Sequence, residues 1–510
     1  SITQTGYKGI GFKSVFTDSF RVYIKSGDYS FKFDKLAPVY KDFWSLYADY
    51  YNSKTPQAKR EFEREYRGRE SLFTDIDRIP WQIKPIWVSR NEFPDELMGS
   101  PFFMNQQVAI ALEIGNTIFK QKNYHGMISG LMKEPRFLLF LRNTRSFTFK
   151  SIEPTESISI AVKNSRYGLD VYQNEELSAS YIREDFIIAI DNDEFEKAGL
   201  NFKRRELDGG KIEFYDNNGL RLENIPEKLG RLQSTVVSFA AKVIGSSIEQ
   251  LSKDETILFN YLPTSDQRFE FPFLVNADFV SKTDREFIQI ENKWNHYLFY
   301  HIGINCIKWI AQLGQIVNDN AEKRFFPYAK TYLNLLPETL LDEENVEQSS
   351  INKSFNHGIK SALEEVPFIL DSNGALKKCS EILIDETGIS FILGAYFFKT
   401  ISSTEKSIPH LIIDQSKLRK EYLNIDKFTA HQLKVKLSTV ENQLFLKSTI
   451  ERTNQIRYDS FIKWLDEFSL NFTEEYLWLC SLPIVKLSDG VFSLNDALSK
   501  SNVLIRSSKT

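Results

Sequence analysis

Three glycines near the start of the 510-residue chain have the spacing of a phosphate-binding loop. Gly6, Gly9 and Gly11 follow the pattern G-x-x-G-x-G and stand directly before an apolar run that begins at Phe12. Glycine lets the backbone approach a ligand closely and adopt positive φ angles. Exposed amides that lead into a helix attract anions, because the N-terminal end of a helix carries partial positive charge. The segment therefore predicts a site for a phosphate group.

The order of the residues excludes two common phosphate-binding patterns. A Walker A loop needs its lysine directly after the last glycine, whereas Phe12 separates Gly11 from Lys13 and Ser14. A dinucleotide-binding fingerprint has its glycines in the order G-x-G-x-x-G after a β-strand. The glycine order is reversed here, and the five residues before Gly6 cannot hold that strand.

The stretch from Gly6 to Phe16 resembles the ATP lid of the GHKL superfamily, which comprises gyrase, heat-shock chaperones, histidine kinases and MutL. Its sequence G-Y-K-G-I-G-F-K-S-V-F is similar to G-Q-F-G-V-G-F-Y-S-A-Y of the ninety-kilodalton heat-shock chaperones. Two alternating stretches, 20–25 and 29–33, follow across a Ser-Gly-Asp turn and predict an antiparallel hairpin. A glycine lid, a helix and a hairpin is also the order of elements in that superfamily.

The resemblance implies that the cofactors are ATP and Mg²⁺ and that the lid wraps the phosphates. The catalytic glutamate, the magnesium-binding asparagine and the aspartate that reads adenine precede the lid in that superfamily. We therefore expect the chain to begin inside the lid, with these residues and the metal ligand upstream of Ser1. Lys8 and Lys13 add positive charge to the lid or are simply solvated, and both alternatives stay open. The residues assigned to phosphate binding are Gly6, Lys8, Gly9, Ile10, Gly11, Phe12, Lys13 and Ser14.

A second set of motifs resembles the transducer region of the sacsin-like branch of the same superfamily. Residues 259–264 read F-N-Y-L-P-T, and residues 271–279 read F-P-F-L-V-N-A-D-F. The triplet D-R-E at 284–286 and the pair W-N at 294–295 follow, in a segment that we expect to be one helix. The resemblance covers about residues 1–310, apart from an insertion.

Two basic residues in the matching loop, Arg285 and Lys282, are candidates for a catalytic role. Transducer domains often direct one cation to the γ-phosphate, because the negative charge that develops in phosphoryl transfer needs a fixed positive partner. The alternative for Arg285 is a cap or a salt bridge at the start of the nearby helix. Lys203, Arg204 and Arg205 form another basic cluster, which we expect in a solvated loop, with nucleic-acid binding as a minor alternative.

The composition favours a globular protein without a disulfide framework. Apolar residues make up 42% of the chain and aromatic residues 14%, which is enough to form cores. The formal net charge of -4 creates no global attraction to nucleic acid or to an anionic membrane. Three widely spaced cysteines argue against paired disulfides and structural zinc, and the six histidines are scattered. No apolar run reaches the roughly 18 residues of a membrane span, so we expect a cytoplasmic protein.

The expected fold class is α+β, with a partial GHKL α/β sandwich, a transducer-like α/β domain and a mainly helical C-terminal region. The proposed limits are 1–145 for the ATP-binding part, with a helical insertion at about 36–75, then 146–310 and 311–510. The last region contains two proline-led repeats that predict hairpins near 366–384 and 482–494.

Several local expectations accompany these limits. We expect strands at 81–88, 108–114, 145–163 and 186–191, and a helix around 455–470. The apolar run 137–143 predicts either a buried strand or a short buried helix, and the acidic stretch 338–350 predicts a loop.

The leading functional hypothesis is an ATP-driven conformational switch that acts as a homodimer or on a partner protein. The sacsin-like resemblance implies chaperone or remodelling work, and a prokaryotic anti-phage defence role is a second setting. The alternatives are a non-catalytic scaffold that retains the fold, or a DNA-associated ATPase of the MutL or gyrase kind.

Overall fold

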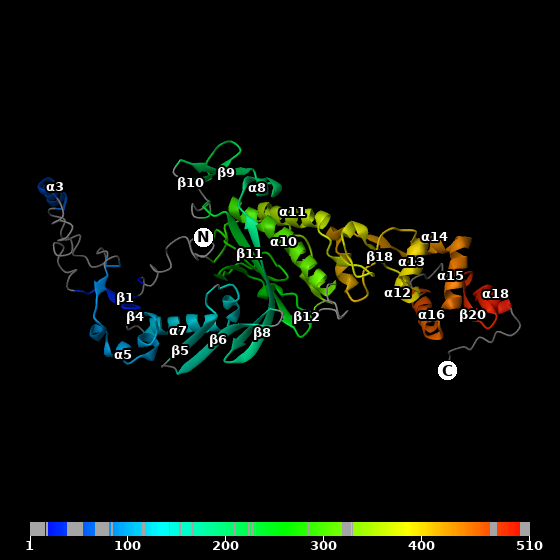
Figure 1. Ribbon diagram of the computed structural model, residues 1–510, viewed down its shortest axis with the longest axis horizontal. Helices are drawn as coiled ribbons and strands as arrows, with labels where there is room; N and C mark the ends of the chain where they lie inside the picture. Colours follow the sequence, from blue (N-terminus) through cyan, green and yellow to red (C-terminus); the bar gives the residue numbers. More distant parts are fainter. Residues whose placement is uncertain are drawn as a thin grey trace. The chain divides into compact units, whose positions relative to one another are not determined.

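The chain folds into a mixed α+β structure, in agreement with the expected class. It divides into two compact units, which are described separately. The N-terminal unit comprises Thr3–Glu134 and Phe149–Ser157, and the main unit comprises Pro135–Thr148 and Ile158–Thr510. The computed structural model (Figure 1) describes residues 16, 19–37, 55–66, 81–82, 85–114, 118–141, 143–151, 155–165, 168–208, 210–222, 225, 229, 231–282, 286–318, 328, 330–469 and 477–499.

The N-terminal unit is built on an antiparallel sheet with the strand order β3-β2-β1-β4. Strands β1 (Ser19–Ser26) and β2 (Tyr29–Asp34) form the hairpin that the sequence predicts. Gly27 lies between them at a φ of +58°, a left-handed conformation that glycine adopts without steric cost. Strands β3 (Ile86–Trp87) and β4 (Val108–Ile114) lie within the expected stretches 81–88 and 108–114.

Both faces of this sheet carry buried apolar side chains, because alternate residues of a strand point to opposite faces. On one face, Val22 and Ile24 pack with Phe16, Phe33 and Trp81. The opposite face is a separate cluster of Tyr23, Phe93, Phe103 and Ala109. The helices of this unit are α3 (Pro56–Tyr66), which lies in the expected insertion, α5 (Asp95–Met98), α6 (Pro101–Met104) and α7 (Ile118–Met132).

The main unit contains a larger sheet with the strand order β14-β13-β15-β11-β8-β7-β6-β5 and with β12 paired to β11. The described pairs between β6, β7, β8, β11, β12 and β15 and the pair β13–β14 are antiparallel where registers are given, and β13 and β15 run parallel. The longest strand, β8, pairs with β7 through its first half and with β11 through most of its length. The strands are β5 (Ser146–Ser151), β6 (Glu156–Asn164), β7 (Leu169–Gln173), β8 (Glu176–Ala189), β11 (Ser234–Ile244), β12 (Ser247–Ile248), β13 (Leu258–Asn260), β14 (Leu262–Pro263) and β15 (Leu274–Asn276).

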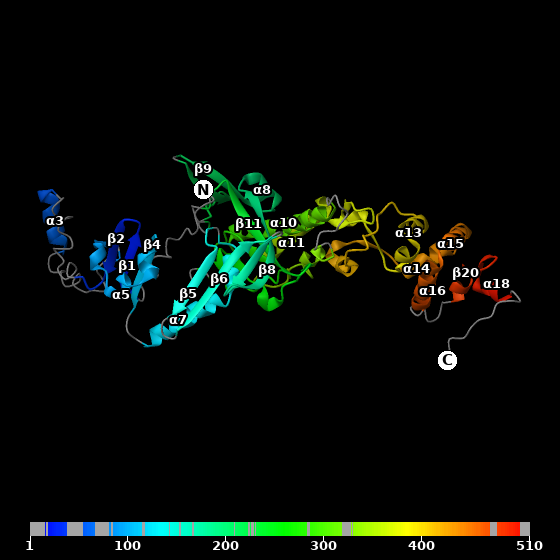
Figure 2. The same cartoon turned by 60° about the horizontal axis from the view of Figure 1, so that its bottom comes forward.

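Two long helices, α10 (Lys293–Asn318) and α11 (Ser349–Glu365), pack side by side next to β11 (Figures 1 and 2). Their backbones touch at two glycines. A Cβ added to Gly303 would lie 2.4 Å from the Phe355 carbonyl oxygen, and one added to Gly358 would lie 2.0 Å from the Tyr300 carbonyl oxygen. Only glycine fits at these two positions, because every other residue carries a Cβ.

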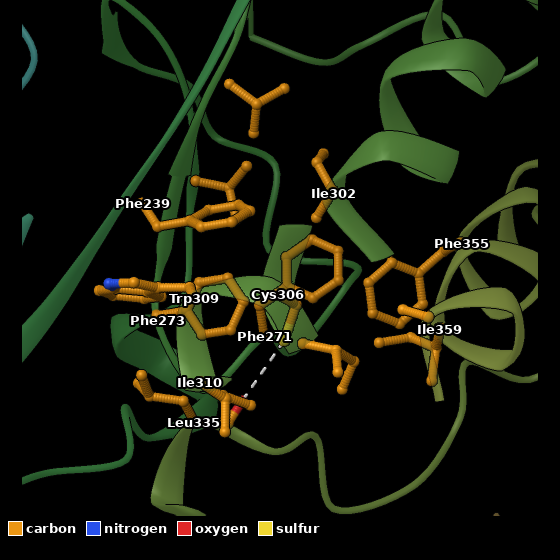
Figure 3. Packing of buried hydrophobic residues seen from close by; sticks show 14 of the residues in the cluster. Phe239, Phe271, Phe273, Ile302, Cys306, Trp309, Ile310, Leu335, Phe355 and Ile359 are labelled. Carbon is orange, nitrogen blue, oxygen red and sulfur yellow. Dashed lines mark hydrogen bonds between the residues drawn. The ribbon is translucent and has the colours of Figure 1, made fainter. Parts of the chain in front are cut away.

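Aromatic rings fill the space between the sheet and these helices (Figure 3). Phe239 of β11 and Phe273, which directly precedes β15, have ring centroids 4.9 Å apart, and Phe273 meets Trp309 of α10 edge-on at 5.6 Å. Phe271 contacts Phe355 of α11 at 5.0 Å. Each buried aromatic side chain removes a large apolar surface from water, so this first core dominates the stability of the unit.

A second core occupies the C-terminal part of the main unit. It contains residues from Leu383 to Val491, and the first core runs from Ile182 to Ile425. Strand β18 (Leu383–Asp385), which pairs in parallel with β19 (Asp426–Phe428), serves both: Ile384 faces the first core and Leu383 the second. The helices around the second core are α12 (Ile389–Leu393), α13 (Ala395–Ser402), α14 (Ala430–Leu437), α15 (Val440–Arg452), α16 (Gln455–Ser469), α17 (Leu477–Cys480) and α18 (Leu494–Ser499).

Both C-terminal hairpins are present where the sequence predicts them. The first joins β16 (Ile369–Leu370) to β17 (Leu376–Lys377), and the second joins β20 (Pro483–Leu487) to β21 (Gly490–Ser493). Helix α16 matches the expected helix around 455–470. Residue 310, the expected limit of the middle domain, lies within α10 and is fully buried in the first core.

Three local features differ from the expectations. In the run 137–143, a 3-10 helix, η3 (Pro135–Leu138), covers only the first two residues, and residues 139–141 are neither helix nor strand, so neither alternative describes the run. Strand β8 begins ten residues before the predicted 186–191. Residues 203–205 lie in a strand, β9 (Phe202–Leu207), and not in a loop. Within the described stretches, no helix combines the length and apolar character needed to cross a membrane.

Candidate functional site

The two groups of residues predicted to form the site belong to different units. The whole phosphate-binding set, from Gly6 to Ser14, lies outside the described residues, as does Arg285. Lys282 is described and is exposed on the main unit. Phe16, which ends the glycine motif, is buried and meets the rings of Phe33 and Trp81 edge-on at 5.3 and 5.2 Å. The end of the motif is therefore fixed against the β1–β2 hairpin.

A buried carboxylate, Asp34, ties the end of this hairpin together. It forms ion pairs with Arg21 at 2.9 Å and with Lys32 at 3.0 Å, and it accepts a hydrogen bond from the Leu36 amide at 3.1 Å. Burial alone would raise the pKa of Asp34, but the interactions with Arg21 and Lys32 outweigh it and hold the pKa below its usual range. Arg21 also reaches Glu113 on β4 at 2.8 Å, so the network joins three strands.

We predict that acid weakens the N-terminal unit through Asp34. A carboxylate with a lowered pKa contributes stability above its ordinary pKa of 3.8, and this contribution is lost as the pH falls through the folded value. Asp34→Asn should therefore cost about 1–3 kcal/mol at neutral pH and progressively less in acid. Urea unfolding at neutral and at acidic pH, with hydrogen exchange of the β1 and β2 amides as the readout, measures this loss of stability. Asp28→Asn in the exposed turn is the control, and an equal cost of Asp34→Asn at both pH values would contradict the prediction.

In the main unit, the F-N-Y-L-P-T and F-P-F-L-V-N-A-D-F segments meet in one group of polar side chains. The Asn276 side-chain oxygen accepts the Tyr261 amide at 2.7 Å, and Asn260 donates to the Phe279 carbonyl at 2.8 Å. The Asp278 carboxylate accepts the Tyr261 hydroxyl at 2.8 Å and the Thr235 hydroxyl at 3.0 Å. With Asn295, which is described below, these side chains form what we call the polar cluster: Thr235, Asn260, Tyr261, Asn276, Asp278 and Asn295.

Tyr261 is held in an unfavourable backbone conformation by this cluster. Its φ of +63° lies in the left-handed region, where a bulky residue with a Cβ is strained. Such conformations cost about 1–3 kcal/mol and persist only where surrounding contacts fix them. Here Asn276 binds the backbone amide and Asp278 binds the phenol of the same residue. These hydrogen bonds hold Tyr261, which connects β13 to β14, against the end of β15.

The polar cluster also fixes the segment 280–290, which carries Lys282. Asn295 is fully buried; its side-chain nitrogen donates to the carbonyls of Val280 and Gln289, and its oxygen accepts the Val280 amide, each at 2.8 Å. Backbone pairing continues from Lys282 to Phe287 at 2.8 Å and in a bridge between Ser281 and Ile288. The described ends of this segment therefore form a narrow hairpin.

A second carboxylate holds the returning arm of the segment. Asp266 is 1% exposed, and Arg268 donates to both of its oxygens. One of these oxygens also accepts the Ile288 amide at 3.1 Å. A bidentate guanidinium–carboxylate pair is geometrically specific, so Asp266 holds the Ile288 amide in one position.

The helix predicted from Asp284 through Asn295 is wrong for residues 286–292. Residues 286–292 are not helical, and α10 begins at Lys293. The reason is that Asp266 and Ser281 engage Ile288, while the Asn292 side chain accepts the Trp294 amide at 3.0 Å and so starts the helix there.

Chemically, this arrangement presents an exposed ammonium group on a backbone position that the Lys282–Phe287 hydrogen bond holds. Lys282 lies above the Phe287 ring, with its nitrogen 5.8 Å from the ring centre. A cation on a fixed backbone stabilises an anion without reorganising when the anion arrives. No role was predicted for the cluster residues that hold the described ends of this segment, although three of them occur in the motifs N-A-D and W-N. A comparison with known protein families found no match, and no solved structure matches the chain.

Proposed function

We propose that the chain is part of an ATP-driven conformational switch of the GHKL type. In this proposal the lid residues Gly6, Gly9 and Gly11, with the amides that follow them, wrap the phosphates of ATP. Lys282 or Arg285 supplies the cation that stabilises the negative charge of the γ-phosphate. The protein would act in chaperone or remodelling work or in anti-phage defence, as a homodimer or with a partner protein.

The observation that carries the proposal is the hairpin β1–β2 directly after the glycine motif. Phe16 anchors the end of the motif on that hairpin, and β4 extends the sheet on its other side. A lid needs such a fixed base, because its amides bind phosphate only if their backbone returns to one position. The anchored loop of Lys282 adds a second element that a nucleotide-dependent switch requires.

The proposal places the metal ligand outside the described residues. Among these, no group of three His, Cys, Asp or Glu side chains comes together. Mg²⁺ is usually held by one or two carboxylates and the phosphates of its nucleotide, so a dedicated cluster is not required. When bound, the ion would neutralise charge on the phosphates.

Calorimetric titration of Mg²⁺-ATP into the natural full-length protein tests the proposal. We expect micromolar binding that Gly11→Asp abolishes, because a carboxylate in the lid repels the phosphates and a Cβ blocks their approach. Gly126→Asp is the matched control: it makes the same change at an exposed position of α7, where an added Cβ meets nothing within 4 Å.

Absence of binding by the folded full-length protein would contradict the switch and leave the scaffold hypothesis. Equal binding by wild type and Gly11→Asp would show that any nucleotide site lies elsewhere.

A further inference from the structure

A two-stranded ribbon of the main unit is firmly attached through one of its faces. Strand β9 pairs antiparallel with β10 (Lys211–Asp216), and Phe202, Ile212 and Phe214 on one face are buried. Phe195 of α8 (Asn192–Lys197) covers these residues, with its ring 4.5 Å from that of Phe202 and 6.1 Å from that of Phe214. The ribbon is therefore a rigid part of the unit and not a solvated loop.

The other face of the ribbon is basic. Residues directly opposite each other in a ladder share a face, and the register pairs Arg205 with Glu213 and Lys203 with Tyr215. Arg221 is bridged to Tyr215 and so joins the same face. The four cations of this surface, which we call the basic face, are Lys203, Arg205, Lys211 and Arg221, and all four are exposed.

One carboxylate, Glu213, stands among the four cations and neutralises them only in part. It is 7% exposed and binds Lys211 at 2.8 Å, Arg221 at 3.3 Å and the Tyr215 hydroxyl at 2.6 Å. The hydrogen bonds from Lys211 and Tyr215 hold the pKa of Glu213 below its usual range, so the group is charged at neutral pH. Within the described part of the chain, no carboxylate pairs with Lys203 or Arg205.

The remaining acidic residues of the ribbon point away from the basic face or are engaged elsewhere. Glu206 is paired with Ile212 and lies on the opposite face. Asp216 accepts the amides of Asn218 and Leu220 and closes a turn. The Arg205 guanidinium lies over the Tyr215 ring of the same face, 5.0 Å from the ring centre. Positive charge therefore gathers on one face of the ribbon, although the chain as a whole is acidic.

We propose that the basic face of the β9–β10 ribbon binds the phosphate backbone of double-stranded nucleic acid. A two-stranded ribbon is one of the few elements that fit the major groove of a duplex. Residues two apart on a strand are about 7 Å apart, so Lys203 and Arg205 form a row that can follow a line of phosphates. In Figure 1, β9 and β10 lie at the edge of the main unit, outside the large sheet and the helix pair α10 and α11. Figure 2 shows β9 at the same edge. This proposal is independent of nucleotide binding at the lid.

The contact would be non-specific in sequence and sensitive to salt. Each phosphate that a lysine or arginine neutralises releases counterions, and the logarithm of the binding constant falls with the logarithm of salt concentration by about 0.9 per contact. Four cations therefore predict a slope of about -3 to -4. Loss of two of these cations should make the slope less negative by about 2 and weaken binding at least about tenfold.

Fluorescence anisotropy with a short labelled duplex of random sequence measures this, between about 50 and 200 mM salt. The test variant is Lys203→Glu with Arg205→Glu, and Lys203→Gln with Arg205→Gln repeats the test with a smaller change. Lys399→Glu with Lys463→Glu is the control, because it reverses two exposed lysines of the same unit on α13 and α16. We expect weaker duplex binding and a less negative salt slope in both test variants, and we expect the control to bind the duplex like wild type.

Three outcomes would overturn the proposal. The first is that the wild-type protein binds no duplex, and the second is that the test variants bind it as well as the control does. The third is that vesicles with anionic lipid compete with the duplex and bind more tightly. The last result would assign the basic face to a membrane surface instead. Gly11→Asp should bind the duplex like wild type with and without ATP, so failure here is distinguishable from failure of the proposed nucleotide site.

Discussion

Replacement of Gly358 by alanine is expected to destabilise the main unit strongly, because the added methyl group has no space. The new Cβ would lie 2.0 Å from the Tyr300 carbonyl oxygen and 3.1 Å from the Ile304 amide nitrogen. Both neighbours are backbone atoms of α10, so no side-chain rotation can relieve the clash. Helices α10 and α11 must move apart instead.

Separation of these helices would loosen the first core. Phe355 of α11 sits against Phe271, and Cys306 of α10 points its sulfur toward the Leu335 carbonyl at 3.7 Å (Figure 3). Protein interiors are close-packed, and added volume in them costs about 1–3 kcal/mol, and more where backbone must shift. We expect a loss above about 3 kcal/mol for Gly358→Ala, a large share of the 5–15 kcal/mol that holds a typical domain folded.

Urea and thermal unfolding of a graded series of variants test this expectation. Gly303→Ala should be almost as damaging, because its Cβ would lie 2.4 Å from the Phe355 carbonyl oxygen. Gly314→Ala is the matched control on the same helix: its Cβ would meet the Leu376 side chain at 2.9 Å, and that side chain can turn away. Similar stability of Gly358→Ala and Gly314→Ala would show that the helices separate easily.

Asn295→Leu is expected to release the segment that carries Lys282. Leucine has a similar volume but leaves the Val280 amide without its hydrogen bond and removes one partner each from the carbonyls of Val280 and Gln289. A buried polar group without a partner costs about 1–3 kcal/mol, so we expect a total loss of about 2–4 kcal/mol. The segment should then sample several conformations.

The functional effect of Asn295→Leu rests on the proposed ATP switch. If Lys282 must be fixed to stabilise the γ-phosphate, Asn295→Leu should lower ATP turnover of the full-length protein as much as Lys282→Ala does. Lys282→Ala removes an exposed side chain and should change the stability little. Turnover assays combined with hydrogen exchange at Ile288 separate the two effects. Unchanged turnover, with the Ile288 amide exposed, would show that this loop has no part in the reaction.

The parts of the fold that follow from short-range patterns could be predicted from the sequence. Alternation of apolar residues around Gly27 predicts the β1–β2 hairpin, and the turn residues at Gly374 and Gly490 predict the two C-terminal hairpins. In each case the residues that decide the structure lie within a few positions of one another. The residues of the glycine motif fall outside the described part of the chain, so their phosphate-binding role stays a prediction.

The parts that depend on distant residues could not be predicted in this way. The false helix before Lys293 arises because the carboxylate that holds Ile288 is Asp266, 22 residues earlier. The close approach of α10 and α11 depends on Gly303 and Gly358, which are separated by a long stretch of chain. The strained φ of Tyr261 depends on Asn276, and no local pattern reveals it. The motifs singled out these segments, but they did not reveal which residues the segments contact in the folded chain.

Strand β18 limits how the main unit can be divided into fragments. Ile382 and Ile384 belong to the first core, while Leu383 between them belongs to the second. The first core continues to Ile425, well after the second core has begun. No single cut of the polypeptide between Ile182 and Val491 can leave both cores whole, whether a protease, a truncated gene or an exchange of segments between genes makes it. A fragment intended to keep the first core closed must extend through Ile425 and will carry an unfinished piece of the second.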